Sequence, residues 1–187
     1  MTLLEMKKKV LGMIEELNPN SELLTDDPDI STKINEVINQ VMFELVRMKK
    51  IAKFIRMDVS EDDLIEFADL EKECGYEIYQ INVVQGVNYM PRANGTVLEI
   101  LESGTAKIDV FVYPERITEK TKDKAYEFEL SADALEIMPY GVAADLLKSD
   151  VSAEYGRVYA ERYETMLQRL DPRYSMGSVY IEGGFSA

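Results

Sequence analysis

The chain lacks histidine and has a single cysteine, Cys74, among its 187 residues. Histidine is the most common general base and metal ligand, so its absence removes the usual way to activate a nucleophile or to bind a transition metal. One cysteine excludes an intrachain disulfide, and without a histidine to activate it the thiol is better interpreted as a buried or half-buried side chain than as a nucleophile. We therefore expect no enzymatic activity, no cofactor and no metal site.

Long apolar runs are also missing. No stretch approaches the roughly 18 apolar residues of a membrane span, so we expect no membrane partner. The first basic residues lie within an amphipathic helical pattern instead of preceding an apolar segment, which predicts no signal peptide. With 46% hydrophobic and 30% charged residues, the composition is typical of a globular domain.

Positive charge is scarce, with 21 basic residues against 35 acidic ones and a net charge of −14. This balance disfavours a nucleic-acid-binding protein, because neutralised phosphates supply most of the affinity of such proteins. Basic residues cluster only at Lys7–Lys9 and at Arg47–Arg56. A solvated helix face is the simpler interpretation of both runs, and a patch that contacts phosphates is the alternative. The acidic clusters at 26–29, 61–63 and 71–73 lack the spacing of a calcium loop and are predicted to be solvated turns.

The N-terminal region is predicted to be helical. Thr2 and Glu5 have the spacing of a capping box, which predicts a helix from about Leu3 to Leu17. A second, amphipathic helix is capped by Asp29 or Ser31. Its apolar residues recur at spacings of four and three, which places them on one face: Ile34, Ile38, Val41, Leu45 and Met48.

A change of pattern near Phe54 predicts β structure. In the segment 106–113, Ile108, Val110 and Val112 alternate with polar or aromatic residues, as in a half-buried antiparallel strand. Asn94-Gly95 is typical of a tight hairpin turn. The predicted strands are 54–59, 77–84, 86–90, 96–101 and 106–113.

Helical patterns return near the C-terminus. The segment 126–130 is predicted to be a last strand or an extended approach to these helices. Pro139 suits the first turn of a helix that ends at about Lys148, because proline has no N–H to donate there. Gly141 gives that helix a low-profile face for close packing, and a final helix is predicted from about Ser152 to Leu170.

Together these patterns predict an α+β fold that is mainly a helical bundle, with an inserted antiparallel β-sheet region and an extended C-terminal tail. The bundle comprises residues 1–53 with 131–170, the β region residues 54–130, and the tail residues 171–187. In the tail, Val179, Tyr180 and Ile181 form an apolar, strand-forming triplet, and with Phe185 they are candidate partner-binding residues. A frayed terminus is the alternative.

One stretch of the C-terminal helical region resembles a known family. It contains an apolar run ending in proline (Ile137 to Tyr140), a Val-Ala-Ala-Asp-Leu-Leu helix (Val142 to Leu147), a Ser149-Asp150 turn and a Tyr-rich helix (Tyr155 to Tyr163). This layout resembles the C-terminal helices of head–tail connector (adaptor) proteins of tailed phages and prophages.

The resemblance implies a structural virion protein assembled in the cytoplasm of a bacterial host. Such a subunit forms a homo-oligomeric ring, binds the portal protein and tail proteins, and continues the DNA channel, so that DNA meets it only as the passing genome. The family offers no catalytic residues to transfer to this sequence. A second hypothesis is a non-enzymatic adaptor or regulatory protein that binds its partner through the β region and the tail. A third, a hydrolase with a carboxylate pair, has the least support.

Overall fold

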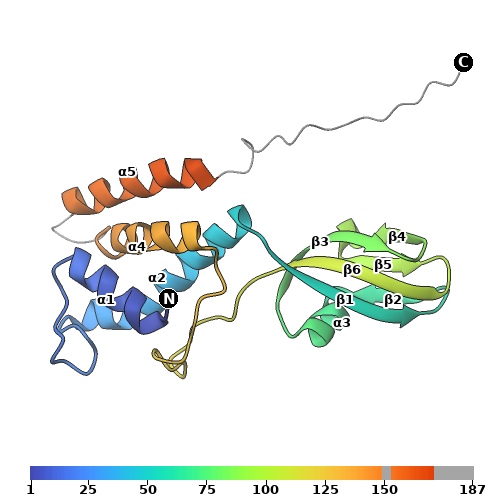
Figure 1. The fold of residues 1–187 in the computed structure, drawn as a ribbon, viewed down its shortest axis with the longest axis horizontal. Helices are drawn as coiled ribbons and strands as arrows, with labels where there is room; N and C mark the ends of the chain where they lie inside the picture. The colour runs from blue at the N-terminus through green and yellow to red at the C-terminus, as the bar shows by residue number, and fades with distance from the viewer. Residues whose placement is uncertain (149–152, 171–187) are drawn as a thin grey trace, which may run out of the picture.

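The computed structural model describes residues 1–148 and 153–170. Its described residues form five α-helices and two small antiparallel sheets, in two parts that lie side by side along the long axis of the molecule (Figure 1). One part is helical and the other contains the sheets. The helices of the helical part are α1 (Leu3–Met13), α2 (Pro28–Met48), α4 (Ala132–Leu146) and α5 (Ala153–Leu170).

The local signals at the starts of α1 and α2 were partly predictable. The capping box is confirmed: the Glu5 N–H donates to Thr2 Oγ1 at 3.2 Å, and the Thr2 N–H donates to Glu5 Oε2 at 2.8 Å. However, α1 ends at Met13 and does not reach Leu17. The α2 cap is Asp27, whose carboxylate accepts from the N–H of Asp29 at 2.8 Å, because Pro28 occupies the first helical position.

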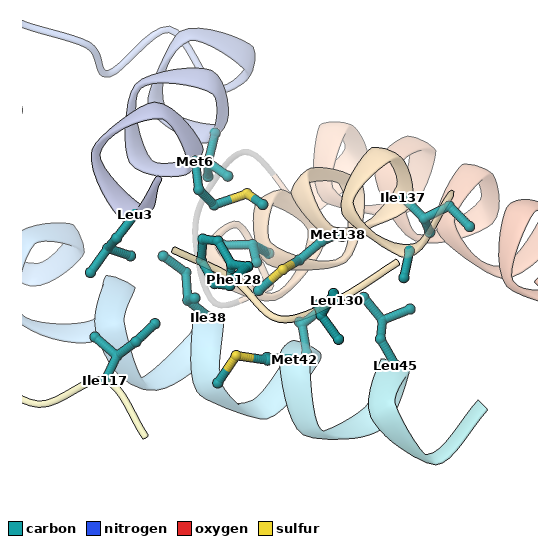
Figure 2. Packing of buried hydrophobic residues seen from close by; sticks show 14 of the residues in the cluster. Leu3, Met6, Ile38, Met42, Leu45, Ile117, Phe128, Leu130, Ile137 and Met138 are labelled. Carbon is teal, nitrogen blue, oxygen red and sulfur yellow. The ribbon is translucent and has the colours of Figure 1, made fainter. Parts of the chain in front are cut away.

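The helical part has its own hydrophobic core, to which α1, α2 and α4 contribute buried side chains (Figure 2). Of the apolar stripe predicted for α2, Ile34, Ile38, Val41 and Leu45 belong to this core and Met48 does not; Ile38 and Leu45 are fully buried. The chain between the sheets and α4 also contributes: Ile117, Phe128 and Leu130 pack among the helices. Asn39 fixes that segment, since its amide donates to the Ile117 carbonyl at 2.7 Å and accepts from the Ile117 N–H at 2.9 Å.

The β part is built around a second, separate core. In the first sheet the strand order is β1-β6-β3, and in the second it is β2-β5-β4. Inward-facing residues such as Ile55, Ile108 and Leu98 bury themselves between the sheets together with Leu70 of a short helix, α3. The elements are β1 (Ile51–Val59), β2 (Leu64–Glu66), α3 (Phe67–Cys74), β3 (Ile78–Gln85), β4 (Tyr89–Arg92), β5 (Val97–Ile100) and β6 (Gly104–Val112).

The prediction of a mainly helical bundle is wrong. Over the described residues the chain is 45% helical and 24% strand, which makes it an α+β protein with two comparable parts. The physical reason is that the sheets enclose a hydrophobic core of their own, instead of extending from a bundle that holds the only core.

The predicted position of Pro139 is also wrong. Helix α4 begins at Ala132, so Pro139 lies in its interior, where proline removes a backbone hydrogen bond. Packing compensates for this loss. Pro139 is buried, as are Ala134, Met138 and Val142, because α4 is apolar around most of its circumference and is covered by α1, α2 and α5. Among the described helices, none is both long and apolar enough to span a membrane.

Candidate interaction surfaces

Part of the stretch that carries the family resemblance forms the contact between α4 and α5. Gly141 lies so close to α5 that an added Cβ would be 2.9 Å from Cε2 of Tyr163. On the other helix, a Cβ on Gly156 would be 3.1 Å from that of Leu147. Ile137 and Met138 are buried beneath this contact. The close approach predicted from Gly141 is therefore confirmed, and small residues on both helices make it possible.

A hollow of about 370 Å³ lies beside this contact. Its walls include Glu44, Asp145, Lys148, Arg157 and the ring of Tyr163. The Tyr163 hydroxyl donates to Glu44 Oε2 at 2.8 Å, and burial, followed by this bond, raises the pKa of Tyr163. Because these two groups satisfy each other, the hollow offers no unpaired buried group that would select a ligand.

The basic run Arg47–Arg56 is divided between two faces. Lys49, at the end of α2, pairs with Asp133 in the first turn of α4 at 3.0 Å, and Lys53 of β1 pairs with Glu129 at 3.3 Å, so the second pair ties the start of the β part to the segment that enters α4. Burial lowers the pKa of Lys53, but its bonds to Tyr76 and Glu129 more than offset this and raise the pKa overall. Bonds to Ser131 and then Lys49 lower the pKa of the Asp133 carboxyl.

Two of the remaining cations of that run, Lys50 and Arg47, lie against aromatic rings. Lys50 Nζ is 4.3 Å from the centre of the Phe111 ring. Arg47 Nη2 donates to the Tyr113 hydroxyl at 2.8 Å. Farther along β1, Arg56 stands directly opposite Lys107 of β6. Phe54, between these ends, is 61% exposed.

These side chains share the outer face of the β1-β6-β3 sheet and the adjoining end of α2. The inner face of the same strands carries Ile55, Ile108 and Val110, which are buried in the core. Side chains alternate along a strand, so Phe54, Arg56 and Lys107 point away from that core. We call this surface the basic face and define it by Arg47, Lys50, Phe54, Arg56, Lys107 and Phe111.

Two carboxylates also belong to this surface. Asp58 accepts from the Thr105 hydroxyl at 2.7 Å, and Asp109 stands opposite Phe54 in the register of β1 and β6. The basic face therefore carries more positive than negative charge, but it is not uniformly positive.

Three aromatic rings join the helical part to the β part. The Tyr113 ring centre is 4.9 Å from that of Phe43 and 4.8 Å from that of Tyr79. The Tyr79 hydroxyl donates to the Val46 carbonyl of α2 at 3.3 Å. We call Phe43, Tyr79 and Tyr113 the neck.

The opposite side of the β part is acidic. Between residues 61 and 74 the sequence has seven acidic residues and one basic residue, Lys72. We call this segment, with the β1–β2 turn, β2 and α3, the acidic layer. Its exposed carboxylates include Glu61, Asp62 and Glu73. Within the described residues, no group of three or more Cys, Asp or Glu side chains could hold a metal ion, and Cys74 is half-buried near the Tyr76 carbonyl.

The other basic run, Lys7–Lys9, meets lysines from a distant part of the sequence. Lys7 pairs with Asp123 at 2.9 Å. Lys8 lines a shallow hollow together with Lys122, Lys124 and Glu22. Sequence reasoning missed this cluster because the two segments lie more than a hundred positions apart, and no local pattern signals that they meet.

The candidate partner-binding residues Val179, Tyr180, Ile181 and Phe185 lie outside the described residues, as does the Ser149-Asp150 turn of the resemblance. Comparison of the chain with models of known protein families and with curated proteins found no match.

Proposed function

We propose that this chain is a structural virion protein, a head–tail connector ring subunit that bridges portal and tail and continues the DNA channel. The observation that carries the proposal is the α4–α5 pair. The stretch that resembles connector proteins is the stretch whose glycines let α5 pack against α4 and α2. The resemblance therefore concerns residues with a definite packing role, not exposed positions of arbitrary identity.

The two-part shape supports the same role. In Figure 1 the β part extends from one end of the helical part, so that each part presents its own surfaces. A ring subunit needs separate surfaces for its two neighbours and for the components above and below it. The net charge of −14 also suits a channel wall, because carboxylates repel DNA phosphates and let the duplex pass without being retained.

Direct imaging tests this proposal. The purified chain is mixed with the portal assembly encoded beside its gene, and the complex is examined by negative-stain electron microscopy. We expect an additional ring on the portal, and we expect the neighbouring genes to encode portal and capsid proteins. A Gly141→Val variant, which disturbs the seat of α5, should dock poorly, whereas Gly12→Ala in α1 should dock normally.

Two results would contradict the proposal. One is a gene neighbourhood that encodes no virion component, together with purified virus particles that do not contain this chain. The other is a stable symmetric dimer that never docks on a portal, which would favour the adaptor or regulatory hypothesis instead.

A further inference from the structure

We infer that the basic face of one copy of this chain docks on the acidic layer of a second copy, in a head-to-tail contact. The inference rests on the proposed function in that it specifies how ring subunits meet. It is argued from the charge distribution of the β part alone.

As far as the described residues show, the basic face is a sheet surface whose cations form no ion pair with a carboxylate. In the described part of the chain, the ion pairs involve other residues, and none joins a carboxylate to Arg47, Lys50, Arg56 or Lys107. Arg56 and Lys107 are direct cross-strand neighbours, an arrangement that is destabilising for like charges. An anionic partner would remove this repulsion.

The partner that fits this face is a protein surface, not a nucleic acid. A single-stranded nucleic acid needs open ring faces for its bases. Here Lys50 lies over the ring of Phe111, and Arg47 lies over that of Tyr113. A surface that combines carboxylates with apolar contacts for the exposed Phe54 meets all of these conditions.

The same chain provides such a surface on the far side of its β part. Leu70 of α3 is fully buried in the core against which the inner faces of β1 and β6 pack. The acidic layer and the basic face therefore lie on opposite sides of that core. The layer also exposes an apolar side chain, Leu64, beside its carboxylates.

This distribution of charge selects the symmetry of the contact. A two-fold dimer through the basic face would bring cations against cations, and a dimer through the acidic layer would bring carboxylates together. Only the contact of one face with the other is attractive, and such a contact is heterologous, so it produces a ring when its rotation closes.

Charge-swapped variants test the inference. The first variant, Lys50→Glu/Arg56→Glu/Lys107→Glu, makes the basic face acidic. The second, Glu61→Lys/Asp62→Asn/Glu73→Lys, weakens the charge of the acidic layer and spares carboxylates that bond the backbone, such as Asp63 and Glu71. Asp62 is changed to asparagine because its φ is 67° and asparagine tolerates that conformation.

Self-association is measured by sedimentation over a range of protein and salt concentrations. The wild-type chain should self-associate at high protein concentration, less so as salt is added, and each variant alone should associate at least about tenfold more weakly. An equimolar mixture of the two variants should regain association, because the unchanged basic face of the second variant meets the unchanged acidic layer of the first. The control, Lys9→Glu/Lys33→Glu/Lys120→Glu, makes the same change in net charge as the first variant, on exposed positions of the helical part, and its self-association should weaken much less.

Several outcomes would overturn the inference. These are a wild-type chain that stays monomeric at high concentration and low salt, variants that behave like the control, or a mixture that fails to recover. Binding of a single-stranded oligonucleotide that the first variant alone abolishes would assign the face to nucleic acid instead. Rings on the portal that the charge swaps leave intact would refute this contact but not the connector proposal. If mixing the variants restores association but the chain does not dock on the portal, the connector proposal is refuted and this contact is not.

Discussion

At the scale of single residues, Gly141 and Gly12 show how surroundings decide the effect of one methyl group. At Gly141 an added Cβ would be 2.9 Å from the Tyr163 ring and 3.0 Å from Val41, whereas nothing lies within 4 Å at Gly12. Gly141→Ala should destabilise the fold by about 1–3 kcal/mol through overpacking. Gly12→Ala should stabilise it by about 0.5–1 kcal/mol through helix propensity. Urea melts of both variants check this pair, and equal effects would contradict the close packing of α5.

Asn39 is one of the few buried polar side chains in the described residues, and it bonds both backbone groups of Ile117. Asn39→Ala leaves that N–H and C=O without partners in the core, each at a cost of about 1–3 kcal/mol. Gln40, the next residue on α2, is exposed, so Gln40→Ala should change the free energy of unfolding by no more than about 0.5 kcal/mol. Chemical denaturation of the two variants compares them, and similar costs would show that the Asn39 bonds are dispensable.

Tyr126 makes stability depend on alkaline pH. Burial, and to a lesser extent Glu115 and Glu129, raises the pKa of Tyr126 to about 12. A raised folded-state pKa means that the stabilisation is fully present below the unfolded pKa of about 10 and is lost as the pH rises toward 12. Urea melts at pH 8, 10 and 11 should show this decline, and Tyr126→Phe should show a shallower one. Equal slopes for the two proteins would exclude Tyr126 as a source of the decline.

At the scale of elements, α2 supports the helical part through a single buried stripe. Leu45 is fully buried in that stripe, whereas Leu23, in the loop before α2, is 65% exposed. Leu45→Ala should cost about 2–5 kcal/mol because it removes buried methyl groups and leaves a cavity. Leu23→Ala deletes the same atoms at an exposed position and should cost no more than about 0.5 kcal/mol. Thermal and urea melts test this, and a Leu45→Ala variant as stable as the wild type would show that the stripe is not packed.

Periodicity predicted some elements well and missed others for physical reasons. The alternation in β6 was strong, and its predicted inner residues Ile108, Val110 and Val112 are fully buried. Helix α3 was missed because eight residues give little periodic signal and acidic residues surround it, although Phe67, Leu70 and Cys74 do have helical spacing. Pro139 was misplaced because burial, which outweighs the local cost of proline, is a tertiary effect that no local pattern contains.

The basic face could be predicted only in part. The run Arg47–Arg56 was evident in the sequence, but it was interpreted as a single face of a helix. Ile51 to Val59 form a strand, and its period of two places Lys53 and Arg56 on opposite faces. That rule, applied to the sequence, would have separated them. The pairing of Arg56 with Lys107 required knowledge of the register between β1 and β6, which local sequence does not specify.

At the scale of the whole molecule, two separate cores predict energetic independence. Leu45 belongs to the helical core and Ile108 to the β core. The costs of Leu45→Ala and Ile108→Ala should therefore add to within about 0.5 kcal/mol in the double variant. Gly141→Ala and Tyr163→Ala, whose side chains would touch, should depart from additivity by more than that. Denaturation of both double-mutant cycles tests the contrast, and strong coupling of Leu45 with Ile108 would mean that the two cores act as one.

The neck has a mechanical consequence. Within residues 1–148 and 153–170, the chain crosses between the two parts at two places, from the end of α2 into β1 and from the end of β6 through Tyr113. Twisting one part against the other would break the Tyr79 bond to the Val46 carbonyl, separate the Tyr113 ring from that of Phe43 and strain the Lys53–Glu129 pair. We therefore expect a torque applied at the tip of the sheets to be transmitted to the 21-residue helix α2.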